Sequence, residues 1–427
     1  MTWLLLALLQ QDKVTASEPV LRATISGGLE FDFVSRDGAI QRSRSVLNGT
    51  VGGSTEQLWI GWATVRLDVD LPEDISAVLE IGHWSTDDEA DLPFGSNPES
   101  TDIFPLEAYV EVAGLFVPTL HFRAGIVPLG YRLRPYGEAF FLDVNDSEPF
   151  YTGASTFVRN TADRTVLTPA GVHLRWTIAD FMGAEFFWAH TKDGSAGTGD
   201  ENLFGALLNG LLSPNVSFDL AIALVTGGDR GRVATVGLGI DAYLSQTRWL
   251  ELFGEVYGQF GRLAPGVGKA AWALAAGSRA HGSSGWLELA FAFRSGDADP
   301  EDGSDGGFQS YESVAQFAIV ESAMYGLDVD TNVWSVRGAG ALRPRARLEL
   351  RLDAAYFRFH RYVRTAAGDR LSSEKQLGVE IDATASWELA SGAVRLRGAF
   401  LLGSDFLSDV ADARTAWMVA PEISVNF

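Results

Sequence analysis

The chain has 427 residues, of which 46 are glycine and none is cysteine, and its formal net charge is −22. The lack of cysteine excludes disulfide scaffolds, thiolate metal sites and cysteine nucleophiles. The acidic excess argues against nucleic acid as a partner, because a polyanion is repelled by an acidic surface. No run of ~18 apolar residues occurs, so a membrane could be crossed only by strands.

Residues 1–17 resemble an export signal, with a short apolar core at Trp3–Leu9. Val14 and Ala16 provide the small residues of a cleavage site, although no Lys or Arg precedes the core. The alternatives are a frayed terminus or a misassigned start. We leave this segment out of the fold and expect residues 18–427 to form one domain.

The rest of the chain repeats a period of two. In residues 21–34, for example, Ile25 and Phe31 fall on one side and Arg22 and Glu30 on the other. This alternation is typical of a strand with one apolar face. It predicts eighteen strands near 21–34, 57–71, 75–84, 104–114, 118–127, 166–178, 181–191, 201–212, 215–227, 232–244, 248–260, 270–280, 284–295, 332–343, 345–359, 374–388, 393–403 and 414–427. The apolar run of 201–212 could alternatively form a helix.

The connections between these strands alternate between long and short. Long ones are expected near 35–55, 85–103, 128–165, 192–200, 261–269, 296–331, 360–373 and 404–413, with a shorter one at 227–231 in the same series. Tight turns lie between them, near 72–74, 115–117, 179–180, 213–214, 245–247, 281–283, 344 and 390–392. An even number of strands with short turns at one end and long loops at the other predicts an all-β fold, a transmembrane antiparallel β-barrel.

The alternative fold is a soluble all-β chain of sandwiches or a propeller. No repeat of about 40 to 50 residues is present, which disfavours a propeller. No linker rich in Pro, Ser or Thr divides the chain, which disfavours a row of sandwich domains.

The final residues, ARTAWMVAPEISVNF, form an amphipathic strand with an aromatic residue at each end of its apolar face, Trp417 and Phe427. A soluble edge strand of this kind would invite aggregation, whereas a barrel leaves no free edge. The ending resembles the C-terminal signature of bacterial outer-membrane barrels, which the barrel-assembly machinery reads. We therefore expect an outer-membrane location, with the assembly machinery, membrane lipid and lipopolysaccharide as partners.

A barrel of eighteen strands is too wide to be filled by its own side chains and holds water. With the apolar face toward lipid, the candidate pore-lining and solute-binding residues are Arg123, Arg175, Arg337, Arg351, Arg395, Arg397, Glu349, Asp353, Glu380 and Asp382. Opposed rows of charge would create a transverse field that aligns polar solutes and sets ion preference. Alternatively, neighbouring arginines and carboxylates pair with each other and stiffen the wall.

Two long loops carry further candidates. The loop at 128–165 contains Phe140 and Phe150 and is too apolar to extend into water, so it could fold inward. The candidate charges of such a constriction are Arg132, Arg134, Asp143, Asp146 and Glu148. The alternative is packing on the barrel mouth. The loop at 296–331 contains DADPEDGSDGG, which we interpret as a solvated acidic loop, with a Ca²⁺ site as the alternative.

Enzyme motifs are missing. The chain has no G-x-S-x-G and no H-E-x-x-H, and Gly266-Val267-Gly268-Lys269-Ala270 lacks the spacing of a phosphate-binding loop. The six histidines are scattered. We expect no catalytic residue, no metal and no cofactor.

The C-terminal third resembles the alginate-export family of outer-membrane porins. The similarity rests on the strand Gly378-x-Glu380-x-Asp382 and on Gly403-x-x-Phe406 after the next strand. Leu106–Glu111 followed by Phe122–Gly125 is similar to an earlier strand pair of that family, although Gly125-Ile126-Val127 replaces its Gly-Arg-Gln motif. The resemblance implies an eighteen-stranded barrel with an arginine-lined pore, to which Arg337, Arg351, Arg395 and Arg397 would contribute.

These observations predict an outer-membrane channel that works by passive diffusion. The leading hypothesis is a porin for hydrophilic, anionic solutes or polysaccharide, of the alginate-export type. The alternatives are a general diffusion porin with weak cation preference and, from another class, an outer-membrane hydrolase.

Overall fold

The computed structural model describes residues 22–427 except 49–56, 73, 87–103, 128–129, 132–141, 144–169, 193–200, 228–230, 245–247, 300–301, 309–316, 322–325, 328, 330 and 365–368. Within these residues, strands dominate, with two short helices, α2 (Gly38–Asn48) and α3 (Asp405–Ala411). Neither of these helices is long and apolar enough to cross a membrane.

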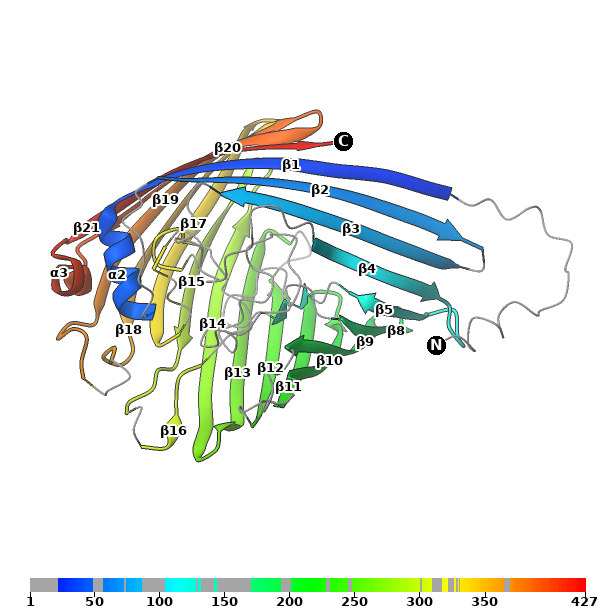
Figure 1. Cartoon of the computed structure of the whole chain (residues 1–427), viewed down its shortest axis with the longest axis horizontal. Helices are drawn as coiled ribbons and strands as arrows, with labels where there is room; N and C mark the ends of the chain where they lie inside the picture. Colours follow the sequence, from blue (N-terminus) through cyan, green and yellow to red (C-terminus); the bar gives the residue numbers. More distant parts are fainter. Residues whose placement is uncertain are drawn as a thin grey trace, which may run out of the picture.

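The strands form one large antiparallel sheet that curves into a barrel (Figure 1). The sheet has nineteen strands, of which β16 has only two residues and lies against the end of another strand, so the wall has eighteen. The wall strands are β1 (Arg22–Arg36), β2 (Gln57–Leu71), β3 (Ile75–Thr86), β4 (Phe104–Ala113), β5 (Leu120–Ile126), β8 (Ala170–Ala179), β9 (Met182–Lys192), β10 (Glu201–Ser213), β11 (Val216–Gly227), β12 (Arg232–Tyr243), β13 (Leu250–Ala264), β14 (Val267–His281), β15 (Gly285–Arg294), β17 (Val333–Arg345), β18 (Leu348–Phe359), β19 (Gln376–Leu389), β20 (Gly392–Leu402) and β21 (Thr415–Asn426). The short strands are β6 (Gly130–Tyr131), β7 (Leu142–Asp143) and β16 (Ser304–Asp305). The predicted all-β barrel of eighteen strands is confirmed.

The barrel closes between its first and last strands. β1 pairs with β2 on one side and with β21 on the other, with Gly28 opposite Asn426. The backbones of Gly27 and Phe427 exchange two hydrogen bonds of 3.0 Å. Pairing along this seam is interrupted at Pro421, which has no N–H to donate. The closed ring leaves no wall strand with an unpaired edge.

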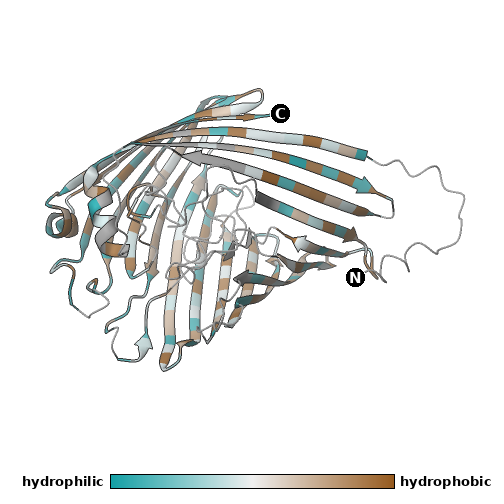
Figure 2. Cartoon of the chain, in the orientation of Figure 1, coloured by the Kyte–Doolittle hydropathy of each residue, from teal (hydrophilic) through white to brown (hydrophobic). Residues whose placement is uncertain are grey.

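Successive side chains alternate between the two faces of the wall, which gives the banded colouring of the strands in Figure 2. On β12, Val236, Leu238 and Ile240 are 39% to 41% exposed, while the residues between them face inward. Similar exposed apolar side chains occur on nearly every wall strand. Such a continuous apolar exterior is unstable in water and suits the hydrocarbon of a membrane.

Three details differ from the sequence analysis. The predicted long connection at 261–269 is wrong, because β13 and β14 both extend into this range and meet in a tight turn at Pro265 and Gly266. Gly266 has φ +85°, a conformation that favours glycine. The helical alternative for 201–212 is also wrong, since this segment pairs on both sides as β10. The predicted loops at 35–55 and 404–413 contain α2 and α3.

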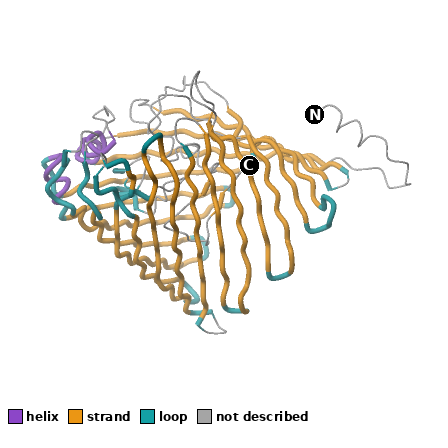
Figure 3. Tube along the Cα trace, turned by 90° about the horizontal axis from the view of Figure 1, so that it is seen from below, coloured by secondary structure: helices purple, strands orange, loops and turns teal. Residues whose placement is uncertain are grey.

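Both helices lie at the long-loop end of the barrel, near the strands that close it (Figures 1 and 3). There an apolar core fills part of the interior. It joins Val34 of β1, Ile40 of α2, Phe406 of α3 and Phe357 of β18 with Phe317 from the connection between β16 and β17. Apolar side chains rather than water therefore fill this part of the lumen, which the width of the barrel alone did not predict.

Candidate functional site

Three arginines of the inner wall lie side by side, and we call them the arginine row: Arg351 on β18, and Arg395 and Arg397 on β20. In the register of the sheet, Arg351 and Arg397 are both opposite Thr384 of the strand between them, and Arg395 is opposite Ser386. This alignment places three guanidinium groups at the short-turn half of the lumen.

Each arginine of the row pairs with a carboxylate that is more deeply buried. Arg351 Nε lies 2.7 Å from Asp353 Oδ2, and Arg397 Nη2 lies 2.7 Å from Asp382 Oδ2. Arg395 Nη1 donates to Glu422 Oε1 at 2.5 Å. The arginine side chains are 27% to 45% exposed, whereas the carboxylates are 1% to 18% exposed. The guanidinium groups are therefore exposed to the lumen, and the more deeply buried carboxylates fix their positions through ion pairs.

Arg337 occupies a different environment. It is 2% exposed, forms an ion pair with Glu321, and lies over the rings of Phe317 and Phe357. A solute in the lumen does not reach a side chain covered in this way. The geometry makes Arg337 an anchor for the loop that covers it.

Glu380 and Asp382 of β19 also fasten this loop. Glu380 accepts the backbone N–H groups of Ile319 at 2.6 Å and Val320 at 2.8 Å, and Asp382 accepts that of Ala318 at 3.0 Å. The predicted solvated loop at 296–331 is therefore wrong for residues 317–321, which lie inside the barrel and are fully buried. We call these five residues the inner turn. It folds inward because the wall carboxylates satisfy its N–H groups while its apolar side chains leave water.

The acidic part of the same loop bonds to neighbouring donors. Asp305 accepts Lys269 Nζ and the backbone N–H of Gly307, both at 2.8 Å. Asp302 accepts the backbone N–H of Ser304 at 2.8 Å. No group of three or more His, Asp or Glu in the described part of the chain is arranged to hold a metal ion.

The other predicted wall residues also have charged partners. Arg123 Nε lies 2.8 Å from Glu111 Oε2, and Arg343 Nε lies 2.8 Å from Glu349 Oε2. Of the predicted constriction residues, Arg132, Arg134, Asp146 and Glu148 lie outside the described residues, and Asp143 is described only by its backbone, in β7. For the partly exposed wall residues, contact with a solute stays a prediction.

One charge cluster was not singled out from the sequence. Arg66 of β2 forms ion pairs with Asp68 at 3.0 Å, Glu80 at 3.0 Å and Glu107 at 2.7 Å. One cation against three carboxylates leaves a formal charge of 1 − 3 = −2. The inward parity of these residues was visible in the sequence, but their meeting across three strands was not.

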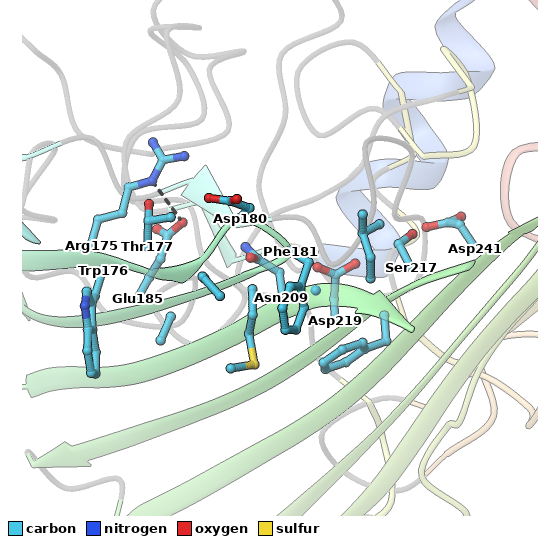
Figure 4. A pocket seen from close by; sticks show the side chains of 17 residues that line it. Arg175, Trp176, Thr177, Asp180, Phe181, Glu185, Asn209, Ser217, Asp219 and Asp241 are labelled. Atoms are coloured by element: carbon cyan, nitrogen blue, oxygen red, sulfur yellow. Dashed lines mark ion pairs between the residues drawn. The ribbon is translucent and has the colours of Figure 1, made fainter. Parts of the chain in front are cut away.

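A cavity of about 410 Å³ opens at the short-turn end of β8 to β12 (Figure 4). It is lined by one cation, Arg175, and four carboxylates, Asp180, Glu185, Asp219 and Asp241, which gives a formal charge of 1 − 4 = −3. Arg175 Nε lies 3.8 Å from Glu185 Oε1 and its side chain is 66% exposed. We call this cavity the acidic mouth. Each wall strand pairs with two neighbours, and β9 lies nine strands from β19 in either direction around the ring. The acidic mouth therefore lies across the barrel from the arginine row.

No protein-family model and no curated protein matches the chain. Its fold is similar to those of solved outer-membrane channels. OccK3 (OpdO) of Pseudomonas aeruginosa is similar with a TM-score of 0.59 and 10% identity over 95% of both chains. OccAB4 of Acinetobacter baumannii matches with a TM-score of 0.57 and 10% identity over 96% of this chain and 99% of that one. OpdK of P. aeruginosa, solved with vanillate, matches with a TM-score of 0.56 and 11% identity over 95% and 98%.

The fold is thus that of an eighteen-stranded outer-membrane channel, and with the apolar exterior it confirms the predicted outer-membrane location. The resemblance to the alginate-export family is wrong, because the solved barrels that match almost the whole chain are channels of the Occ and Opd type. The motifs behind that resemblance were short: Gly378-x-Glu380-x-Asp382 shows the alternation of any lumen-facing strand, and Gly403-x-x-Phe406 lies at the start of α3.

Proposed function

We propose that the chain is a passive diffusion channel for small hydrophilic solutes. The observation that carries this proposal is the closed wall with charged side chains facing inward and apolar side chains facing outward. Such a wall offers polar solutes a path through the hydrocarbon without any chemical step. No cofactor is needed for this function.

A weak preference for cations is favoured by the formal charges along the lumen. The acidic mouth carries −3 and the cluster around Arg66 carries −2, and cations gather where such charge lines a narrow space. The net charge of −22 acts in the same direction. These charges support a general diffusion channel that admits cations somewhat more readily than anions.

A second candidate is the passage of small carboxylate anions, and the arginine row supports it. Its three guanidinium groups are partly exposed, and arginine binds carboxylates through two parallel hydrogen bonds. One similar channel, OpdK, was solved with vanillate, an aromatic carboxylate. On this hypothesis the row and the acidic mouth would together create a transverse field.

The reversal potential of the refolded protein in a planar bilayer with a salt gradient tests both candidates. A potential on the cation side that is unaffected by Arg395→Gln with Arg397→Gln would support the general channel. A potential on the anion side that this double variant abolishes would support the carboxylate route. Protein that is folded but conducts no ions would refute both.

The outer-membrane hydrolase remains a separate alternative, and labelling by a serine-directed probe would be required to support it. The interaction of β21 with the barrel-assembly machinery also remains a proposal. It is supported by the place of β21 at the seam that closes the barrel.

A further inference from the structure

Four cations gather at the long-loop end of β18 and β19, and one of them, Arg358, lies on the outward face of β18. We call Arg358, Arg361, Arg370 and Lys375 the rim cluster. Tyr362 lies between two of its members, with Arg370 Cζ 4.1 Å and Lys375 Nζ 4.4 Å from the centre of its ring. Arg358 is opposite Gln376, the residue after Lys375, in the pairing of β18 with β19. The cluster therefore unites the end of one strand, the start of the next and the connection between them.

The rim cluster differs from the lumen arginines in having no acidic partner. Among the described residues, no carboxylate forms an ion pair with any of its four side chains, although Asp369 adjoins Arg370 and Glu374 adjoins Lys375 in the sequence. Burial, followed by the charges of Arg358, Arg361 and Arg370, lowers the pKa of Lys375. In a chain with a net charge of −22, cations held together without a carboxylate leave a local positive potential.

Other contacts hold the cluster in place. Lys375 Nζ donates to the carbonyl oxygen of His360 at 3.1 Å. The backbone N–H of Arg361 donates to Asn332 Oδ1 at 2.7 Å, and Asn332 Nδ2 donates to the carbonyl oxygen of Arg361 at 3.2 Å. These bonds hold the backbone that carries the cations, while Arg358 and Arg361 remain exposed.

The position of the cluster relative to the membrane follows from the outward face of β18. Leu350 and Leu352 of this face are 44% and 58% exposed, and Tyr356 and Arg358 continue the same face toward the long loops. Tyr356 contacts Trp334, with ring centres 5.4 Å apart, and Trp334 neighbours Phe291 at 6.4 Å. Aromatic residues of this kind mark the membrane interface of barrels, and Arg358 lies roughly 7 Å beyond, where lipid headgroups lie.

We propose that the rim cluster binds the phosphate groups of lipopolysaccharide in the outer leaflet of the membrane. Guanidinium and ammonium groups are suited to phosphate, and basic residues beside a membrane span attract anionic headgroups. Tyr362 and the aromatic residues below would contact the apolar part of the same lipid. This site lies on the outer face and does not depend on what the channel conducts.

Binding of lipid A to the purified barrel in uncharged detergent, followed by native mass spectrometry, tests the proposal. The test variant is Arg358→Gln with Arg361→Gln. The matched control is Arg345→Gln with Arg347→Gln, which removes two exposed arginines at the turn between β17 and β18, at the opposite end of β18. Heat-modifiable migration on a gel verifies that both variants fold.

The test variant should bind diphosphorylated lipid A about tenfold more weakly than the unchanged protein, and the control should bind it as the unchanged protein does. Lipid A without phosphates should bind all three proteins equally weakly. Equal binding of diphosphorylated lipid A by the test variant would overturn the proposal. An equal loss of binding in the control variant would also overturn it. Displacement of the lipid by inorganic phosphate at equal concentration would overturn it too, because free phosphate would then be the ligand.

Discussion

Arg337 and Glu321 are both almost fully buried and form an ion pair where water does not reach, and the buried Arg294 lies 3.8 Å from the same carboxylate. An unpaired charge in such a place is costly, whereas an apolar pair of similar size is tolerated. This ion pair joins β17 to the inner turn. The ion pair therefore fixes the position of the inner turn and does not contact solute.

Arg337→Leu should lower the stability of the folded barrel by about 3 kcal/mol, the low end for a broken buried pair, because Glu321 would keep its charge with only the more distant Arg294 as partner. Arg337→Lys, which keeps the positive charge, should lose less stability than Arg337→Leu. Denaturant unfolding in detergent measures both. If the lysine variant were as unstable as the leucine variant, packing rather than charge would explain the effect.

His360 links the end of β18 to the beginning of the 296–331 loop. Its Nδ1 accepts the backbone N–H of Gly296 at 3.2 Å, which requires this nitrogen to be unprotonated. Burial, followed by the charges of Arg361 and Lys375, lowers the pKa of His360 below its usual value of about 6.5.

A lowered pKa means that the folded arrangement disfavours the protonated ring. The contact with Gly296 should be intact above about pH 6.5 and should weaken as the pH falls below this value. Hydrogen exchange at the Gly296 amide should accelerate between pH 7.5 and 5, beyond the intrinsic pH effect, to a degree that His360→Leu does not show. Identical pH profiles in both proteins would contradict this assignment.

At the scale of elements, the inner turn is the most consequential feature, because it takes space from the lumen. Its hold depends on Glu380, which accepts two of its backbone N–H groups. Glu380→Gln replaces an acceptor for two bonds by a group that also carries two donors.

The substitution Glu380→Gln should release the inner turn and raise the single-channel conductance. Glu374→Gln is the control, since Glu374 is an exposed carboxylate outside the wall strands. We expect this control to conduct as the unchanged protein does. An unchanged conductance in Glu380→Gln would show that the turn does not narrow the path.

Helix α3 covers the apolar core at the long-loop end, and its first turn depends on Ser404. The hydroxyl of Ser404 accepts the backbone N–H of Leu407 at 3.0 Å. Ser404→Ala should destabilise the helix by about 1 kcal/mol, whereas Ser404→Asp should preserve the cap. Faster hydrogen exchange of α3 amides in the alanine variant alone is the expected result. Equal rates in all three proteins would mean that packing of Phe406 suffices.

At the scale of the whole molecule, charges of opposite sign lie across the short-turn half of the barrel. The acidic mouth on β8 to β12 faces the arginine row on β18 and β20, nine strands away around the ring. Fields between such groups act through water and are therefore screened by salt.

The proposed cation preference should accordingly decrease as salt concentration rises. The screening length falls from about 10 Å at 0.1 M to about 3 Å at 1 M ionic strength. Permeability ratios from reversal potentials in 0.1 M and 1 M salt should thus approach those of free diffusion. A preference that persists unchanged at 1 M would indicate direct coordination of the ion instead.

The strands could be predicted from the sequence because each one shows its two faces locally. On β12, for example, the apolar Leu238 alternates with the small Gly239, and this pattern can be read without knowing the rest of the structure. The period of two follows from strand geometry. The eighteen strands, their inward arginines and the outward apolar belt were predicted for this reason. The turn at Gly266 was missed because glycine and proline mark long loops and tight turns alike.

The contacts of the lumen were decided only by the tertiary structure. Glu321 and Arg337 are 16 residues apart, and Glu380 and Ile319 are 61 apart. No local pattern connects such residues, since they meet only after the wall closes and the loop folds inward. The same holds for the rim cluster, which depends on the ends of two strands lying side by side. The sequence by itself determined a membrane barrel with a charged interior, and the closed ring decided which charges are paired, covered or left exposed.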